Sequence, residues 1–172
     1  MKWKTALRRA AVITAAMAAT LVSAAGVSHA ASVAENQPQY VKTFADKCFT
    51  VTNQSGANGA RIVQYQCEND FAQRFTFVPS GIGSTFYIKT FADKCLTVTN
   101  QSGANGAAIV QYQCENDFAQ RFSVVPSGIG STVYLKTFAD KCFTVTNQSG
   151  ANGARIVQYQ CENDFAQRFS IV

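Results

Sequence analysis

The chain repeats one 39-residue segment three times at a period of 47 residues. Residues 40–78, 87–125 and 134–172 are identical in 34 of 39 aligned columns. Periods of this length are typical of solenoids, propellers and closed arrays. Three copies are too few for a typical propeller, and neither terminal copy has the polar cap that a solenoid needs. The repeat therefore favours a closed structure with three-fold symmetry.

Each copy contains four candidate strands separated by turns. In the first copy they are YVKTF, CFTVT, IVQYQC and QRFTFVP, which alternate in polarity or are rich in β-forming residues. The segment SGANGA lies between the second and third strands and contains the Asn58-Gly59 pair, which is typical of a hairpin tip. No stretch has helical periodicity over eleven residues. We therefore expect an all-β fold, a β-trefoil of three four-stranded repeats and twelve strands.

Only five columns vary between the copies. Three of them exchange one apolar side chain for another, as core positions tolerate when volume is roughly kept. These three columns are Val41/Ile88/Leu135, Phe49/Leu96/Phe143 and Phe77/Val124/Ile171. Only the column of Arg61, Ala108 and Arg155 changes its chemistry, and it does so in the middle copy alone.

Residues 1–30 have the three parts of a secretory signal peptide. Four basic residues stand among the first nine, an Ala/Val/Leu-rich run follows, and small residues surround the expected cleavage point. The run is short for a membrane span, with a retained N-terminal anchor as the alternative. We expect a secreted chain that begins near Ala31, with a short segment at 31–39 and one domain at 40–172. The repeats of that domain are 40–86, 87–133 and 134–172.

Removal of residues 1–30 changes the charge argument. This segment holds four of the fifteen basic residues and none of the ten acidic ones, so the formal net charge falls from +5 to +1. A near-neutral chain lacks the electrostatic footprint of a nucleic-acid-binding protein. The same segment also holds the one His, the one Trp and both Met, so no histidine remains to act as a catalytic base.

The six cysteines lie two per copy and always nineteen positions apart. In an exported chain such a regular, even set indicates a disulfide framework. Zinc is the alternative, and the lack of His and of C-x-x-C beyond residue 30 disfavours it. Six cysteines allow fifteen pairings. Equal pairing in equal copies favours Cys48–Cys67, Cys95–Cys114 and Cys142–Cys161.

Three motifs recur in register in every copy: KC-F-T-V, NGARIVQYQC (NGAAIVQYQC in the middle copy) and AQRF. Together they resemble the repeat of ricin-B-type (R-type) lectin domains, where the pattern is K-C-L-D-V, N-G-x-x-V-x-x-W-x-C and N-Q-x-W. The cysteine spacing is similar too, and the likeness covers essentially 40–172. It implies a β-trefoil, disulfides within each repeat, and carbohydrate binding without catalysis, cofactor or metal.

The resemblance also places a sugar-stacking aromatic two positions before the second cysteine, where Tyr65 stands in the first copy. The family's polar anchor, an Asp, is Thr50 in this chain. A sugar needs an aromatic face and a few hydrogen-bonding groups, and the neighbouring loop CENDFAQ offers Asn69 and Asp70. The expected carbohydrate-binding residues are Thr50, Tyr65, Asn69, Asp70, Thr97, Tyr112, Asn116, Asp117, Thr144, Tyr159, Asn163 and Asp164.

Other roles stay open for some of these residues. Tyr65 could be a core tyrosine, Asp70 could cap its own turn, and Gln73 of the AQRF motif could tie a turn to the core. The function that we expect is non-catalytic binding of polymeric or clustered glycans by a secreted monomer through up to three equivalent sites. The alternative is a secreted β-trefoil that binds protein, such as an inhibitor or a toxin subunit.

Overall fold

The computed structural model of the chain describes residues 33–172, so the expected signal peptide at 1–30 lies outside the described residues. Within 33–172 the chain forms short strands and six one-turn 3-10 helices. The strands are β1 (Pro38–Gln39), β2 (Val41–Lys42), β3 (Lys47–Val51), β4 (Ile62–Gln66), β5 (Phe75–Pro79), β6 (Thr85–Lys89), β7 (Cys95–Val98), β8 (Ile109–Tyr112), β9 (Phe122–Pro126), β10 (Val133–Lys136), β11 (Lys141–Val145), β12 (Ile156–Gln160) and β13 (Ser170–Ile171). The 3-10 turns are η1 (Thr52–Gln54), η2 (Phe71–Gln73), η3 (Thr99–Gln101), η4 (Phe118–Gln120), η5 (Thr146–Gln148) and η6 (Phe165–Gln167).

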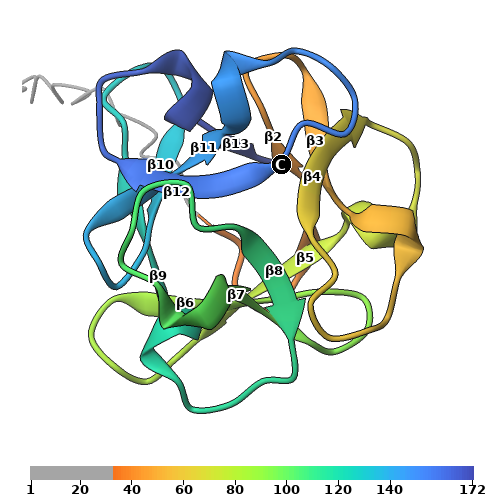
Figure 1. Ribbon diagram of the computed structural model, residues 1–172, viewed down its shortest axis with the longest axis vertical. Helices are drawn as coiled ribbons and strands as arrows, with labels where there is room; N and C mark the ends of the chain where they lie inside the picture. Colours follow the sequence, from red (N-terminus) through yellow and green to blue (C-terminus); the bar gives the residue numbers. More distant parts are fainter. Residues whose placement is uncertain (1–32) are drawn as a thin grey trace, which may run out of the picture.

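The expected twelve strands are present, four in each copy, and they have the β-trefoil arrangement (Figure 1). Copy 1 is drawn in orange to yellow, copy 2 in green and copy 3 in blue, and the three surround the centre of the view. The thirteenth strand, β1, comes from the segment before residue 40. The β-trefoil and its three repeats are thus confirmed, and Pro38–Gln39 joins the fold from outside the predicted repeat.

A ring of paired strands forms the barrel of the trefoil. Antiparallel pairing runs from β1 to β5, β6, β9 and β10, and again from β13 to β2. Backbone hydrogen bonds between Val133 and Phe169 join β10 to the start of β13. Tyr40 separates β1 from β2 and exchanges two backbone hydrogen bonds with Val172. The two ends of the domain therefore meet in the barrel wall.

Three hairpins form the cap of the trefoil: β3 with β4, β7 with β8, and β11 with β12. Each hairpin is crossed by one disulfide close to its open end. The pairs are Cys48–Cys67, Cys95–Cys114 and Cys142–Cys161. The predicted pairing within each copy is therefore confirmed.

Phenylalanine dominates the core between barrel and cap. Phe49, Phe75 and Phe169 are fully buried, and Phe49 packs edge-on against Phe75 and Phe169 with ring centroids 6.3 and 5.0 Å apart. The column of Val41, Ile88 and Leu135 is likewise buried in all three copies. The column of Phe77 is buried in copy 1, whereas Val124 and Ile171 are partly buried at the edge of the core.

A buried glutamine in each hairpin joins it to the loop of another copy. Gln64 of β4 is fully buried, and its Nε2 donates to the carbonyl oxygens of Ser149 and Ala151, at 2.7 and 2.9 Å. The backbone N–H of Gly153 in turn donates to the carbonyl of Gln64. Gln111 holds the copy 1 loop and Gln158 the copy 2 loop in the same way. Each SGANGA loop therefore docks on the next hairpin, and the three contacts close a circle.

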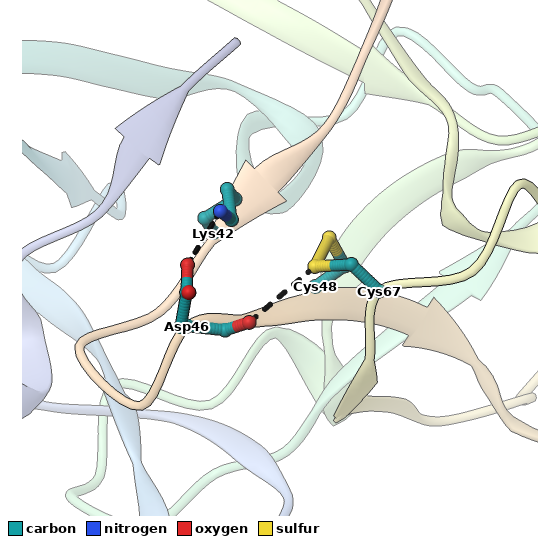
Figure 2. A network of polar contacts seen from close by, with 4 residues as sticks. All are labelled: Lys42, Asp46, Cys48 and Cys67. Carbon is teal, nitrogen blue, oxygen red and sulfur yellow. Dashed lines mark hydrogen bonds and ion pairs between the residues drawn. A yellow bond between two sulfur atoms is a disulfide. The ribbon is translucent and has the colours of Figure 1, made fainter.

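A tight turn in each copy connects the barrel to the cap. In copy 1 the Lys42 ammonium pairs with the Asp46 carboxylate at 2.5 Å, and the carbonyl oxygen of Asp46 lies 3.6 Å from the disulfide sulfur of Cys67 (Figure 2). Asp46 has φ of 58°. The hydrogen bond and the charge of Lys42 hold the pKa of the Asp46 carboxyl below its ordinary value. Lys89 lowers the pKa of Asp93 in the same way.

Candidate functional site

Three open clefts of about 610, 490 and 540 Å³ repeat on the surface, one in each copy. We name them cleft 1, cleft 2 and cleft 3 after the copy that supplies most of their lining. Each lining shares ten positions of its own copy with the other two, and these include a threonine, two glutamines, a tyrosine, a glutamate and an aspartate. These six are Thr50, Gln54, Tyr65, Glu68, Asp70 and Gln73 in cleft 1; Thr97, Gln101, Tyr112, Glu115, Asp117 and Gln120 in cleft 2; and Thr144, Gln148, Tyr159, Glu162, Asp164 and Gln167 in cleft 3.

The tyrosine of each cleft is half exposed. Tyr65 follows the buried residues Ile62, Val63 and Gln64 along β4, at the point where the strand emerges from the core. Its exposed fraction is 41%, and the values for Tyr112 and Tyr159 are 41% and 40%. Tyr65 is therefore not a core residue, and an aromatic surface is available in each cleft.

The aspartate of each cleft has two distinct roles for its two oxygens. Asp70 is the N-cap of η2, where its Oδ1 accepts a hydrogen bond from the backbone N–H of Ala72 at 2.7 Å. Its Oδ2 accepts from the side-chain amide of Gln54. The turn-capping role considered from the sequence is present, and the same carboxylate also lines the cleft. Because a carboxylate offers about four acceptor positions, Asp70 has acceptor capacity left for a ligand.

Gln54 is a cleft residue that the sequence did not single out. It follows Asn53, and both have left-handed backbone, with φ of 51° and 55°. This conformation is uncommon outside glycine and clusters at functional sites. Gln101 and Gln148 have the same conformation, and each donates to the cleft aspartate of its own copy. No motif in the sequence identifies this glutamine, because its contact with the aspartate depends on the backbone conformation.

In copy 1 the threonine and the second glutamine of the cleft lining are hydrogen-bonded to each other. The hydroxyl of Thr50 donates to the carbonyl of Cys48 and accepts from Nε2 of Gln73, at 3.1 and 3.0 Å. Gln73 is buried, donates also to the carbonyl of Gln66, and accepts from the backbone N–H of Glu68. Gln73 thus ties the loop to the hairpin, the structural role considered from the sequence.

Asn69 lies beside the cleft aspartate in sequence but outside the cleft lining. Its Oδ1 accepts from the Tyr40 hydroxyl at 3.3 Å and from the Arg74 guanidinium at 2.6 Å. The guanidinium of Arg74 also stacks 4.9 Å from the centre of the Tyr40 ring. Asn116 and Asn163 make the same contacts with their own tyrosine and arginine. The structure therefore brings Thr50, Tyr65 and Asp70 together and leaves Asn69 in a neighbouring polar cluster.

Glu68 takes a place in the cleft lining next to Asp70. Its Oε1 accepts from Nε2 of Gln66 at 3.1 Å, and the equivalent contacts join Gln113 to Glu115 and Gln160 to Glu162.

Residues 33–172 hold no group of three or more His, Cys, Asp or Glu side chains arranged to bind a metal ion. In the same range no helix has the length and apolarity needed to span a membrane.

The fold and the site together define a class: a β-trefoil with one aromatic, carboxylate-lined cleft per repeat. A family described as "Ricin-type beta-trefoil lectin domain-like" matches residues 35–109 and 90–159. The chain therefore belongs to the ricin-type β-trefoil lectin domain-like family. No curated protein sequence matches it.

Solved structures show the same fold. The designed three-fold symmetric protein ThreeFoil has a TM-score of 0.74 and 25% identity, over 78% of this chain and 97% of ThreeFoil. The Macrolepiota procera ricin B-like lectin, solved in complex with lactose, has a TM-score of 0.69 and 12% identity, over 81% of this chain and 97% of the lectin. The exo-β-1,3-galactanase 1,3Gal43A from Clostridium thermocellum has a TM-score of 0.76 and 21% identity, over 82% of this chain but only 31% of the enzyme.

Proposed function

We propose that this protein is a secreted, multivalent, non-catalytic carbohydrate-binding protein. The observation that carries the proposal is the cleft itself: a half-exposed tyrosine beside a carboxylate with free acceptor positions, built three times. Sugars present apolar C–H faces and several hydroxyl groups, which such a surface can match at the same time. The family and the lectin neighbours support this function.

In each cleft the tyrosine ring offers the stacking face and the aspartate offers the hydrogen-bond acceptor. The Gln54 amide fixes Oδ2 of Asp70, and the η2 cap fixes Oδ1. A carboxylate fixed in this way loses little freedom when a sugar hydroxyl donates to it, which lowers the entropic cost of binding. The cleft aspartates are therefore arranged to orient a sugar that stacks on Tyr65, Tyr112 or Tyr159.

An open cleft with one aromatic ring supports only weak binding of a single sugar. We expect dissociation constants from mM to high µM, about −4 to −6 kcal/mol. Three clefts on one rigid domain change this for a polymer, because binding at one cleft gives the next an mM-scale effective concentration. The protein would then bind polymeric or clustered glycans on the order of 10²-fold more tightly than monosaccharides, and would crosslink them as a monomer.

The role that we propose is non-catalytic, and the residues available support it. The chain has no histidine after residue 30, and its six cysteines are all paired in disulfides, so a histidine-based triad or a thiolate nucleophile cannot be assembled. The cleft carboxylates remain, and their hydrogen bonds to neighbouring amides suit a binding role. The proposed export is supported by the signal-like segment at 1–30 and by the three disulfides, which persist in oxidising compartments.

A glycan array probed with the chain from residue 31 onward tests this function. We expect signals that rise with the density of the immobilised glycan, and loss of these signals in the folded triple variant Tyr65→Ala, Tyr112→Ala, Tyr159→Ala. A parent protein that gives no signal with any glycan would contradict the proposal. It would leave the protein-binding alternative, an inhibitor or a toxin subunit.

A further inference from the structure

The three clefts differ at the column that changes chemistry between the copies. Arg61 lines cleft 1 from copy 1, and Arg155 lines cleft 1 from copy 3. Arg155 also lines cleft 3, its own cleft. Arg155 therefore stands between cleft 1 and cleft 3, and a substitution at this position changes both linings.

Backbone pairing explains this shared position. The strands β4, β8 and β12 lie around the centre of the view (Figure 1). Arg155, which precedes β12, bridges to Val63, a residue of the cleft 1 lining. Arg61 bridges to Val110 and Ala108 to Val157 in the same way. Each cleft is thus flanked by its own member of the column and by that of one neighbour.

The middle copy breaks the symmetry, because it has alanine in this column. Cleft 1 is flanked by two arginines, Arg61 and Arg155. Cleft 3 is flanked by Arg155, which is part of its lining, and by Ala108. Cleft 2 is flanked by Ala108 and Arg61, but its lining contains no arginine. Cleft 1 alone has a guanidinium on both sides.

The two guanidiniums of cleft 1 are free to bind an anion. Both arginines are exposed, and within residues 33–172 neither forms an ion pair with a carboxylate. They offset the formal charges of Glu68 and Asp70, which line the same cleft. A guanidinium is a planar fork of N–H donors that matches a carboxylate in a bidentate geometry. In cleft 2 the same two carboxylates, Glu115 and Asp117, have no arginine in the lining to offset them.

We propose that cleft 1 is the site for acidic sugars, glycan residues with a carboxylate such as hexuronic acids, and that Arg61 and Arg155 are its specificity-determining residues. This inference rests on the proposed function and names the ligand class of one of its three sites. Neutral sugars remain acceptable to all three clefts, since the tyrosine and the aspartate are common to them.

Variants that keep one tyrosine separate the clefts. The double variant Tyr112→Ala, Tyr159→Ala keeps cleft 1; Tyr65→Ala, Tyr159→Ala keeps cleft 2; and Tyr65→Ala, Tyr112→Ala keeps cleft 3. The probes are oligomers of galacturonic, glucuronic and mannuronic acid, each with its carboxyl-reduced, neutral derivative. Calorimetry at low and high salt gives the ratio of acidic to neutral affinity for each variant.

The cleft 1 variant should have the highest ratio, and high salt should lower it. Adding Arg155→Ala to that variant should reduce the ratio by roughly 1.5- to 5-fold, the range of a single exposed ion pair, although Arg155 belongs to a copy whose own tyrosine is gone. Lys141→Ala is the matched control, because it removes a positive charge from the same copy outside the three linings. Ala108→Arg in the cleft 2 variant should raise its ratio, because it places a guanidinium beside a cleft whose lining has none.

Equal ratios in the three single-cleft variants, or a ratio in the cleft 1 variant that Arg155→Ala leaves unchanged, would overturn the proposal. In that case binding of neutral glycans by the parent protein would leave the proposed function standing. A parent protein that binds neither acidic nor neutral glycans would overturn both.

Discussion

Replacing Gln64 by methionine tests how the three copies are held together. The Nε2 of Gln64 donates to two carbonyl oxygens of the copy 3 loop, those of Ser149 and Ala151, and methionine has similar volume but no donor. Each lost hydrogen bond costs about 0.5–1.5 kcal/mol, so we expect the free energy of unfolding to fall by about 1–3 kcal/mol. The Tm should fall by about 3–10 °C.

Gln64→Glu should cost more than Gln64→Met, above about 3 kcal/mol, because it buries a carboxylate against two carbonyl oxygens. Urea unfolding followed by circular dichroism, with the disulfides intact, measures both values. Gln66→Met is the matched control: Gln66 lies on the same strand, β4, but its side chain is exposed, and its one side-chain hydrogen bond within residues 33–172 goes to Glu68.

The Gln64 variants should also weaken sugar binding at cleft 1, because the loop that Gln64 holds supplies Gly153 to its lining. A loss of stability equal to that of Gln66→Met would refute this reasoning. So would a Gln64→Glu variant as stable as Gln64→Met. The first result would show that docking of the SGANGA loop contributes nothing measurable to the closure of the trefoil, and the second that position 64 does not bury its side chain against the two carbonyl oxygens.

Three further predictions concern single sites. Asp70→Ala should lower the free energy of unfolding by about 0.5–2 kcal/mol through loss of the η2 cap, and it should also lower glycan affinity at cleft 1. Asn69→Ala should lower the free energy of unfolding alone. Equal losses of affinity in the two variants would contradict the cleft as described. Removal of one disulfide by the pair Cys95→Ala, Cys114→Ala should lower the free energy of unfolding by roughly 3 kcal/mol, measured in urea, and an unchanged midpoint would refute it. Lys42→Met should raise the pKa of Asp46, which an NMR titration measures. Because the pKa of Asp46 is lowered in the folded protein, the pair stabilises the fold above the unfolded pKa, and this stabilisation disappears as the pH falls through the folded pKa. A difference in stability between parent and variant that persists in acid would contradict the assignment.

Most of the fold could be predicted from the sequence, because the repeat limits the possible architectures. Three equal copies without caps require closure, and the Asn-Gly turns and β-rich runs fix four strands per copy. Strand β1 was not predicted, because Pro38–Gln39 differs from the residues that precede the repeat in the other copies, Thr85–Phe86 and Thr132–Val133. Its position follows from pairing with β5, a contact that a pattern within one copy does not encode.

The candidate site was predictable only where one residue alone defines the chemistry. Tyr65 was identified from the resemblance to the ricin-B-type repeat, and Asp70 from its residue type in the loop that follows Cys67. Gln54 was missed because a left-handed backbone brings it to Asp70. Arg155 reaches cleft 1 only through docking of copy 3 on β4. Contacts between copies and unusual backbone conformations are properties of the folded chain, and sequence spacing does not reveal them.

The most direct test of the central claim is polymer binding by variants in which Tyr65, Tyr112 and Tyr159 are replaced by alanine one, two and three at a time. Circular dichroism first shows that each variant is folded. Affinity for a polymeric glycan identified on the array should fall steeply at the second substitution, because avidity needs two clefts. Crosslinking should vanish at that same step, and the remaining weak binding should vanish at the third. A folded triple variant that binds the polymer as well as the parent would contradict the placement of sugar binding in these clefts.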